Sequence, residues 1–394
     1  MTTSVTALPT DALLGVYRRP PMEIVRGAGV ELFDADGKAY LDFVAGIAVN
    51  ALGYGDAGLE RAMRDALESG VVHVSNLYRT APGERLAEKL VEQSFADRVF
   101  FCNSGAEANE GAFKIARRWA RTIGGAAKHE IIALRGSFHG RLFGTLAATD
   151  RPSYRAPFRP LAGGISIVER DLEELEAALN SETVAALIAE PVQGEGGVRV
   201  LDREFLLALR ELTRKRGILL ILDEIQCGYA RTGTFFAYER AGIEPDLLTV
   251  AKPMAGGLPM GAILATRAVA ETMQPGDHGT TFGGGPFVAS VALHVHERLS
   301  DPSLLKTVRQ NGVWIGSALQ QIVNGSPRAR AVRGVGYMWG IDVVDPAKDV
   351  IARALELGLL VCSAGEHTIR LLPPLVTAKA ELERGVALLS QAIG

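Results

Sequence analysis

The stretch Gly217-Ile-Leu-Leu-Ile-Leu-Asp-Glu-Ile-Gln-Cys-Gly228 joins an apolar run to two adjacent carboxylates. The run carries no charge, which predicts a strand that is buried on both faces, as in a parallel sheet covered by helices. A carboxylate at the end of such a strand is costly unless a cation or hydrogen-bond donors meet it. The stretch therefore predicts an α/β fold, and it raises the question of what compensates Asp223 and Glu224.

Similar apolar runs alternate with helical patterns through the middle of the chain. The alternation predicts a mostly parallel central sheet with helices on both faces. The strands predicted in this way are Arg98–Cys102, Glu130–Leu134, Val184–Ala189, Gly217–Leu222 and Leu247–Ala251, with Gly261–Ala265 as an edge strand. The helices predicted between them are Glu107–Arg121, Leu172–Leu179 and Glu204–Arg216.

The two ends of the chain differ from this middle part. Near the start, Val30–Phe33 and Lys38–Phe43 flank the turn Asp34–Gly37, which predicts a hairpin. Past residue 300, helical patterns surround short strand-like segments, which predicts a smaller α+β domain that the hairpin completes. We therefore expect an N-terminal segment 1–50, a large domain 51–285 and a C-terminal small domain 286–394.

The composition excludes several classes of protein. Of the 394 residues, 47% are hydrophobic and 22% are charged, and the formal net charge is −3. These values are typical of a globular enzyme and give no reason to expect a nucleic-acid or membrane partner. No apolar stretch approaches the roughly 18 residues of a membrane span, and no secretory signal pattern is present. The three cysteines are scattered, which favours a cytoplasmic protein without disulfides or a thiolate metal site.

Unusual residues follow several of the predicted strands, at the edge of the sheet where ligands bind in such folds. In Phe101-Cys-Asn-Ser-Gly-Ala-Glu-Ala-Asn-Glu110, a strand ends and a helix begins. The backbone N–H groups of Gly105 and Ala106 would face an anion such as a phosphate. Ser104 and Glu107 have the spacing of a capping box, so a capped helix without a ligand is the alternative.

Asp223 and Lys252 both stand at the ends of buried strands. The acid could hold a protonated heteroaromatic nitrogen, while a metal site or, for Glu224, a structural ion pair are alternatives. Burial lowers the pKa of a lysine, so Lys252 could act as an amine that forms an imine, unless it merely reaches the surface.

The stretch Gly136-Ser-Phe-His-Gly-Arg141 offers an aromatic ring and a guanidinium after a third strand. Phe138 could stack on a flat ring and Arg141 could bind a carboxylate, whereas His139 alone is more typical of a hydrogen-bonded structural histidine. An anion cradle, a nitrogen-pairing acid, an imine-forming lysine and a stacking ring together describe pyridoxal phosphate.

The motifs NSGAEANE, SFHGR, EPVQGEGG, LDEIQ, AK and GTTFGG occur in this order, and with them the chain resembles the class-III aminotransferases of the ornithine and acetylornithine type. Those enzymes have the fold type I of pyridoxal-phosphate enzymes. The resemblance implies that Lys252 binds the cofactor covalently and then moves the proton, while Asp223 keeps the ring nitrogen protonated. The other cofactor contacts that it implies are Gly105 and Ala106 with the phosphate, Phe138 and Ile225 with the ring faces, and Gln226 with the phenolic oxygen.

The same resemblance implies a homodimer with shared active sites and two classes of small-molecule substrate, amino acids and 2-oxo acids. Thr281 would reach the phosphate in the neighbouring subunit. Arg370 would hold the α-carboxylate of glutamate or 2-oxoglutarate, and Glu195 would mask this arginine when a terminal-amine substrate binds. Arg141, with Thr280 nearby, would then hold the α-carboxylate of that substrate.

The form of these motifs most resembles the N-acetylornithine aminotransferases, so we expect transfer of the δ-amino group of N2-acetyl-L-ornithine to 2-oxoglutarate. Ornithine, 4-aminobutyrate, succinylornithine and carrier-bound lysine-pathway donors are the alternatives within the family. A decarboxylase or aminomutase on the same fold and a nucleotide-binding α/β module are alternatives of other kinds. Three departures from the usual family pattern affect loop conformation and remove no reacting group: Pro253 after the lysine, Gly285 in the GTTFGG loop, and Gly53-Tyr-Gly-Asp56 in place of a Gly-His-x-His-Pro-like turn.

Overall fold

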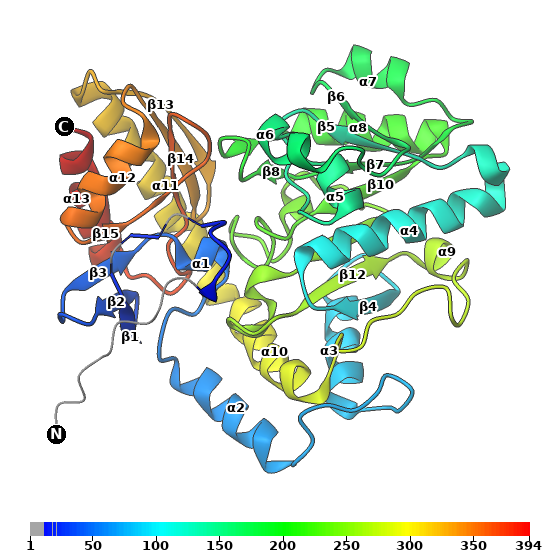
Figure 1. The fold of residues 1–394 in the computed structure, drawn as a ribbon, viewed down its shortest axis with the longest axis horizontal. Coiled ribbons are helices and arrows are strands. Elements are labelled where there is room, and N and C mark those ends of the chain that lie inside the picture. Colours follow the sequence, from blue (N-terminus) through cyan, green and yellow to red (C-terminus); the bar gives the residue numbers. More distant parts are fainter. Residues whose placement is uncertain (1–11, 18, 21) are drawn as a thin grey trace.

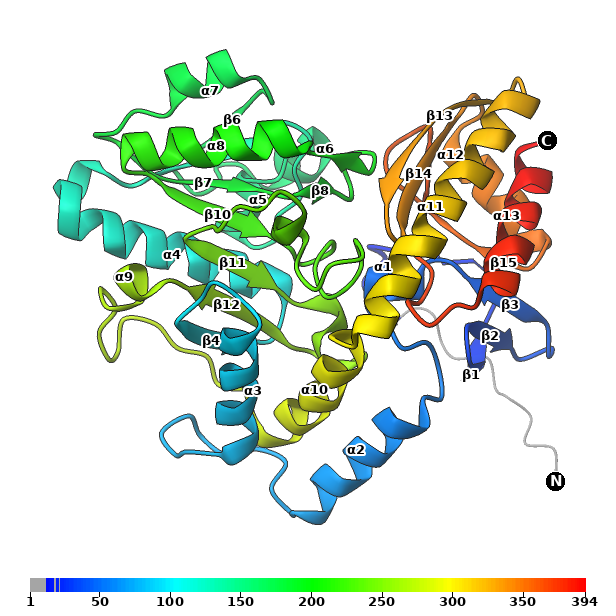
Figure 2. The same cartoon turned by 180° about the vertical axis from the view of Figure 1, so that it is seen from behind.

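The computed structural model describes residues 12–17, 19–20 and 22–394. The chain forms a large lobe around the central sheet and a smaller lobe that contains both the first strands and the C-terminal elements (Figure 1). Helices α10 (Pro286–Leu299) and α11 (Pro302–Gly325) run from one lobe to the other, as Figure 2 shows from behind. No helix within the described residues is both long and apolar enough to span a membrane.

The large lobe is built on a seven-stranded sheet. In spatial order its strands are β4 (Arg98–Cys102), β12 (Gly261–Ala265), β11 (Leu247–Val250), β10 (Leu219–Asp223), β7 (Val184–Ala189), β5 (Glu130–Leu134) and β6 (Ile165–Val168). The strands from β11 to β6 are parallel, which confirms the predicted mostly parallel sheet. Two details differ from the prediction. β12 is an interior strand, antiparallel to both β4 and β11, and β6 was not predicted.

Helices cover both faces of this sheet. Alternate residues of β10 enter two different hydrophobic clusters, Leu219 and Ile221 on one face and Leu220 and Leu222 on the other. Helix α4 (Gly105–Gly124) packs on the first face and α8 (Arg203–Arg216) on the second. α8 ends at Gly217, whose left-handed backbone (φ +60°) suits glycine and turns the chain directly into β10.

The smaller lobe contains two further sheets. One has the order β13 (Ala329–Val335), β14 (Met338–Val343), β17 (Thr368–Leu371) and β16 (Cys362–Ser363). The other consists of β1 (Ile24–Ala28), β2 (Glu31–Asp34), β3 (Ala39–Asp42) and β15 (Leu359–Leu360). The lobe also contains α12 (Ala347–Glu356) and α13 (Lys379–Ile393).

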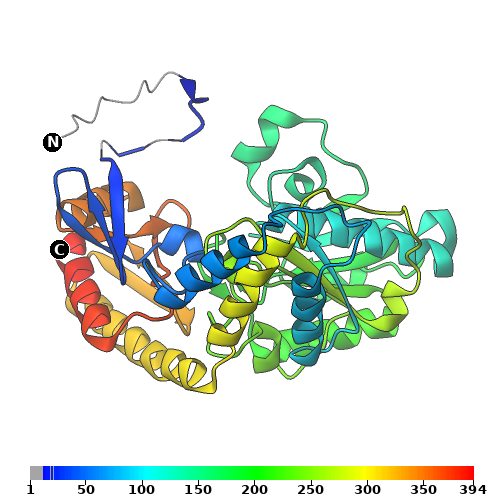
Figure 3. The ribbon, with the colours of Figure 1, turned by 90° about the horizontal axis from the view of Figure 1, so that it is seen from below.

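β15 pairs in parallel with β3, so both ends of the chain share one sheet. Figure 3 shows the blue N-terminal strands beside the orange and red C-terminal elements. This is the α+β part expected from the two terminal segments. The domain boundaries near residues 50 and 285 stay a prediction.

Candidate active site

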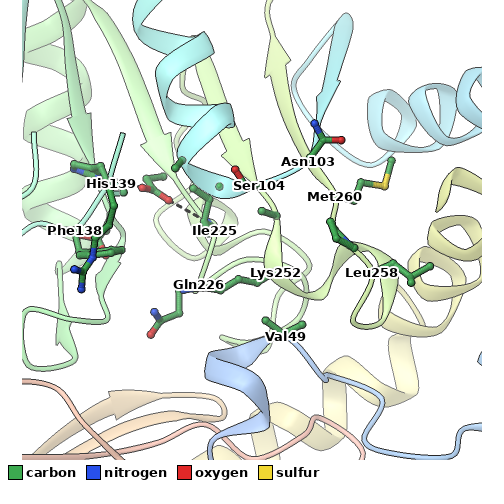
Figure 4. A pocket seen from close by; sticks show the side chains of 18 of the residues that line it. Val49, Asn103, Ser104, Phe138, His139, Ile225, Gln226, Lys252, Leu258 and Met260 are labelled. Carbon is green, nitrogen blue, oxygen red and sulfur yellow. Dashed lines mark hydrogen bonds and ion pairs between the residues drawn. The ribbon is translucent and has the colours of Figure 1, made fainter. Parts of the chain in front are cut away.

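Eight of the twelve functional residues predicted from the sequence line a cavity of about 420 Å³, a size that suits a small-molecule ligand. The cavity lies at the ends of β10 and β11, beside the segment that follows β5 and the start of α4, as the close view in Figure 4 shows. Its lining includes these predicted residues: Gly105, Ala106, Phe138, Arg141, Asp223, Ile225, Gln226 and Lys252.

The first turn of α4 forms one wall. Ser104 is the N-cap, and its hydroxyl accepts a hydrogen bond from the backbone N–H of Glu107 at 3.2 Å. The Glu107 carboxylate accepts from the Asn103 amide at 2.6 Å, one residue before the amide that a capping box would use. Backbone N–H groups in a first turn have no partner within the helix, which leaves those of Gly105 and Ala106 for an anion.

Gly105 also lets this wall approach Ile225 closely. A Cβ atom at position 105 would lie 2.8 Å from the Ile225 side chain, closer than such atoms come in proteins. The glycine is therefore required for the helix start and Ile225 to border the same cavity.

Asp223, at the end of β10, is 3% exposed and is met by hydrogen-bond donors. Its Oδ2 accepts from Asn109 Nδ2 and from His139 Nδ1, both at 2.7 Å, and its Oδ1 accepts from the Ile225 amide at 3.1 Å. Thr249 Oγ1 donates to Asn109 Oδ1 at 2.7 Å, which turns the NH₂ end of this amide toward Asp223. These contacts answer how a buried strand can end in an acid.

Asn109 and Thr249 were missed by the sequence reasoning, because Asn109 is 114 residues from Asp223 and 140 from Thr249 along the chain. His139 is the hydrogen-bonded histidine that its sequence context suggested, and its partner is Asp223.

Two further acids, Glu224 and Glu190, are buried near Asp223, and neither forms an ion pair with any residue that the structure describes. The Glu224 carboxylate accepts from the backbone amides of Ala237 at 2.5 Å and Tyr238 at 2.7 Å, and burial raises its pKa to about 8. The structural ion pair considered for Glu224 is thus replaced by backbone donors. Burial also raises the pKa of Glu190 to about 7, although the nearby His139 opposes the shift. Among the described residues, no three His, Cys, Asp or Glu side chains gather as metal ligands would.

Lys252 lines the cavity and does not reach away to the surface. β11 ends at Val250, and Lys252 begins the short 3₁₀ turn η5 (Lys252–Ala255) with a left-handed backbone (φ +23°). Burial lowers the pKa of its amine, and the charge of Arg370 lowers this pKa further, whereas Glu195 and Asp223 oppose the shift. The amine therefore loses its proton more readily than an exposed lysine does.

Arg370 and Glu195 lie together beside the cavity. Arg370 is on β17, is 2% exposed, and its Nη1 lies 2.6 Å from Glu195 Oε1. The same nitrogen donates to Gln226 Oε1 at 3.0 Å, and Gln226 lines the cavity. The Gln226 side chain thus connects this ion pair to the cavity that Lys252 and Asp223 line.

Arg141 and the two threonines occupy less buried positions. Arg141 is exposed, and its Cζ lies 3.7 Å from the ring centroid of Tyr154. Thr280 Oγ1 accepts from Asn103 Nδ2 at 3.1 Å, so Thr280 borders a lining residue without lining the cavity itself. Thr281 is exposed and lies outside the lining. The structure therefore does not bring these threonines into the cavity of their own subunit.

The groups present fit pyridoxal phosphate. Unpartnered first-turn amides suit its phosphate, a buried acid suits its ring nitrogen, and a buried amine suits its aldehyde. Phe138 and Ile225 come from different elements and supply apolar surface for a flat ring (Figure 4). The departure at Gly285 leaves room, since a Cβ atom there would have its nearest neighbour at 3.4 Å.

Comparison with known proteins agrees with this fit. Residues 16–393 match the family described as Aminotransferase class-III. The acetylornithine aminotransferase of Methanocaldococcus jannaschii is 43% identical over 94% of this chain and 93% of its own length. The N-acetylornithine aminotransferase of Stenotrophomonas maltophilia has a similar structure, with a TM-score of 0.84 and 36% identity over 95% of this chain and 96% of that one. The ornithine aminotransferase of Toxoplasma gondii gives a TM-score of 0.92 at 29% identity, over 97% of this chain and 92% of that one.

Proposed function

Since the chain belongs to the class-III aminotransferase family, we propose that it is a pyridoxal-phosphate enzyme that transfers the δ-amino group of N2-acetyl-L-ornithine to 2-oxoglutarate. The products are N-acetyl-L-glutamate 5-semialdehyde and L-glutamate. Relatives named acetylornithine aminotransferase, 39–44% identical over most of the chain, support this choice of donor.

The observation that carries the proposal is the ion pair of the buried Arg370 with the half-buried Glu195, beside the cavity of Lys252. A transaminase must accept two chemically different substrates at one amine. A guanidinium that exchanges an internal carboxylate for a substrate carboxylate provides for both. A decarboxylase or an aminomutase has no need of such an exchange.

In this proposal the chain holds the cofactor through the start of α4 and the segments that follow β5 and β10. The amides of Gly105 and Ala106 bind the phosphate, Phe138 and Ile225 cover the ring faces, and Gln226 faces the phenolic oxygen. Gln226 Oε1 already accepts from Arg370, so its NH₂ group is the part left to donate to that oxygen. Thr281, from a second copy of the chain, completes the phosphate site.

When bound, pyridoxal phosphate supplies an aldehyde that takes up the amino group and a ring that accepts the electron pair of the broken C–H bond. Asp223 holds a proton on the ring nitrogen, and Asn109 and His139 keep its carboxylate oriented for that contact. Lys252 forms the covalent link to the cofactor. The free amine of Lys252 would accept a proton from the substrate carbon and donate it again, a task that its lowered pKa favours.

The two arginines divide the substrates between them. Arg141 holds the α-carboxylate of acetylornithine, with Thr280 nearby, while Glu195 stays on Arg370. Glutamate and 2-oxoglutarate carry a carboxylate next to the reacting carbon, and this carboxylate displaces Glu195 from Arg370.

A homodimer with shared sites forms part of the proposal. Thr281 is exposed and lies outside the lining of its own cavity, and the apolar side chains of Leu77, Tyr78 and Phe282 are 88%, 69% and 64% exposed. A second copy of the chain that packs against this surface would cover such groups. The buried or half-buried free cysteines agree with a reducing cytoplasm as the working compartment.

A screen of amino donors with purified protein, pyridoxal phosphate and 2-oxoglutarate tests this function. We expect the highest kcat/KM for N2-acetyl-L-ornithine, ahead of ornithine, 4-aminobutyrate and succinylornithine. A higher value for any other donor would replace the assigned substrate. Absence of transamination with every donor, in protein that has bound the cofactor, would refute the reaction itself.

A further inference from the structure

Arg370 is held by three uncharged groups besides Glu195. Its Nη1 donates to Gln226 Oε1 at 3.0 Å, its Nη2 donates to the Ser363 carbonyl at 3.3 Å, and its Nε donates to Cys362 Sγ at 3.4 Å. The guanidinium is thus fixed on three sides without losing its charge. Glu195 is the one anion in contact with it among the described residues.

Cys362 holds this arginine at two points. It lies opposite Arg370 in the antiparallel pair of β16 and β17. Its Sγ accepts from the Arg370 side chain and donates to the Arg370 backbone carbonyl at 3.9 Å. The thiol thus links the side chain of Arg370 to its own strand.

The charge at this position matters because Arg370 is almost fully buried. A carboxylate partner stabilises a buried guanidinium, and one carboxylate balances its charge. With a neutral group at position 362, that partner is either Glu195 or the substrate. A permanent anion at position 362 would take the place of both.

From this geometry we propose that Cys362 is a positioning residue that determines selectivity for the dicarboxylate substrate. It orients the Arg370 guanidinium and, being uncharged, leaves the charge of Arg370 available to the substrate. The inference rests on the proposed role of Arg370 in binding 2-oxoglutarate. It assigns to Cys362 a role that the other two cysteines do not share, since among the described residues neither Cys102 nor Cys227 forms a hydrogen bond with Arg370.

The matched variants Cys362→Asn and Cys362→Asp test the proposal, because their side chains have the same shape and differ by one charge. Each half-reaction is followed separately by the absorbance of the bound coenzyme after rapid mixing. Binding of glutarate, a dicarboxylate that cannot react, is titrated in the same way. We expect Cys362→Asp to weaken glutarate binding and kcat/KM for 2-oxoglutarate by about tenfold or more relative to Cys362→Asn. The half-reaction with acetylornithine should change by no more than about twofold.

Equal values for the Asn and Asp variants would overturn the proposal, because a purely structural cysteine would respond to shape and not to charge. Equal losses in both half-reactions would also overturn it. Arg370→Gln is the reference for the underlying function. If Arg370→Gln leaves glutarate binding unchanged, the role of Arg370 fails and the inference about Cys362 fails with it. If Arg370→Gln weakens binding and the two Cys362 variants agree, the inference about Cys362 alone is wrong.

Discussion

The two arginines proposed to bind substrate carboxylates lie in opposite environments. Arg370 is on an interior strand of its sheet, is 2% exposed, and contacts a carboxylate, an amide, a carbonyl and a thiol. Arg141 follows β5 on an exposed segment and rests on the ring of Tyr154. Over the part of the chain that the structure describes, Arg141 forms no ion pair with an acid.

This difference explains why one arginine needs a switch and the other does not. Water compensates the charge of an exposed guanidinium, so Arg141 can wait for a carboxylate without an internal partner. A buried guanidinium without a partner is strongly unfavourable, so Arg370 requires Glu195 whenever no substrate carboxylate is present. Burial thus creates the exchangeable ion pair, and exposure creates a site that is always open.

Removing the Lys252 amine, which reacts with the substrates that both arginines bind, has the largest expected effect. Lys252→Ala should abolish turnover from both sides, because the covalent link and the proton transfer depend on the same nitrogen. Purified variant that has bound cofactor is assayed with acetylornithine and with glutamate. Turnover near that of the unmodified enzyme with either substrate would refute the role of Lys252. The two arginines would then not bind substrates that react at the same amine.

How far the sequence predicts these environments depends on whether the signal is local. The apolar runs predicted six of the seven strands of the central sheet, and the residues that follow them predicted eight of the 19 residues that line the cavity. The placement of β12 was wrong because a five-residue apolar run looks the same at an edge and in the interior. β6 was missed because Ile165–Val168 is short and includes a serine.

Contacts between distant segments left no local signal. Asn109 reaches Asp223 across 114 residues of chain, and Cys362 meets Arg370 only because β16 and β17 pair. The exposure of Arg141 was equally unpredictable, since its motif specifies a side chain but not the ring of Tyr154 beneath it. Residue types at strand ends were therefore predictable, while the partners that orient them were not.

Arg141→Ala should separate the two substrates. We expect kcat/KM for acetylornithine to fall by about 10- to 100-fold, the range for one lost hydrogen-bonded charge, while kcat/KM for glutamate changes much less. The measurement is steady-state kinetics with each amino donor. An equal loss for both donors would contradict the division of labour between Arg141 and Arg370.

Glu195→Gln removes the internal partner that burial requires for Arg370. The unmasked cation should lower kcat/KM for acetylornithine by about tenfold and leave that for 2-oxoglutarate similar or higher. Glu195 also raises the pKa of Lys252, so its loss disfavours the protonated amine and lowers this pKa further. The acidic limb of the pH–rate profile should accordingly move to lower pH. Movement to higher pH, or a selective loss with 2-oxoglutarate, would contradict the masking role.

The smallest effect is expected at Tyr154, on helix α6 (Pro152–Arg155), where the ring supports Arg141. An exposed guanidinium over an aromatic ring gains about 0.5–1 kcal/mol, which corresponds to roughly two- to fivefold in kcat/KM. Tyr154→Leu should therefore raise KM for acetylornithine by about that factor without changing kinetics with 2-oxoglutarate, because Arg370 has its own contacts. Tyr154→Phe keeps the ring and should behave as the unmodified enzyme. If Tyr154→Phe raises KM as much as Tyr154→Leu does, the hydroxyl of Tyr154 and not its ring supports Arg141, which would contradict this account of Arg141.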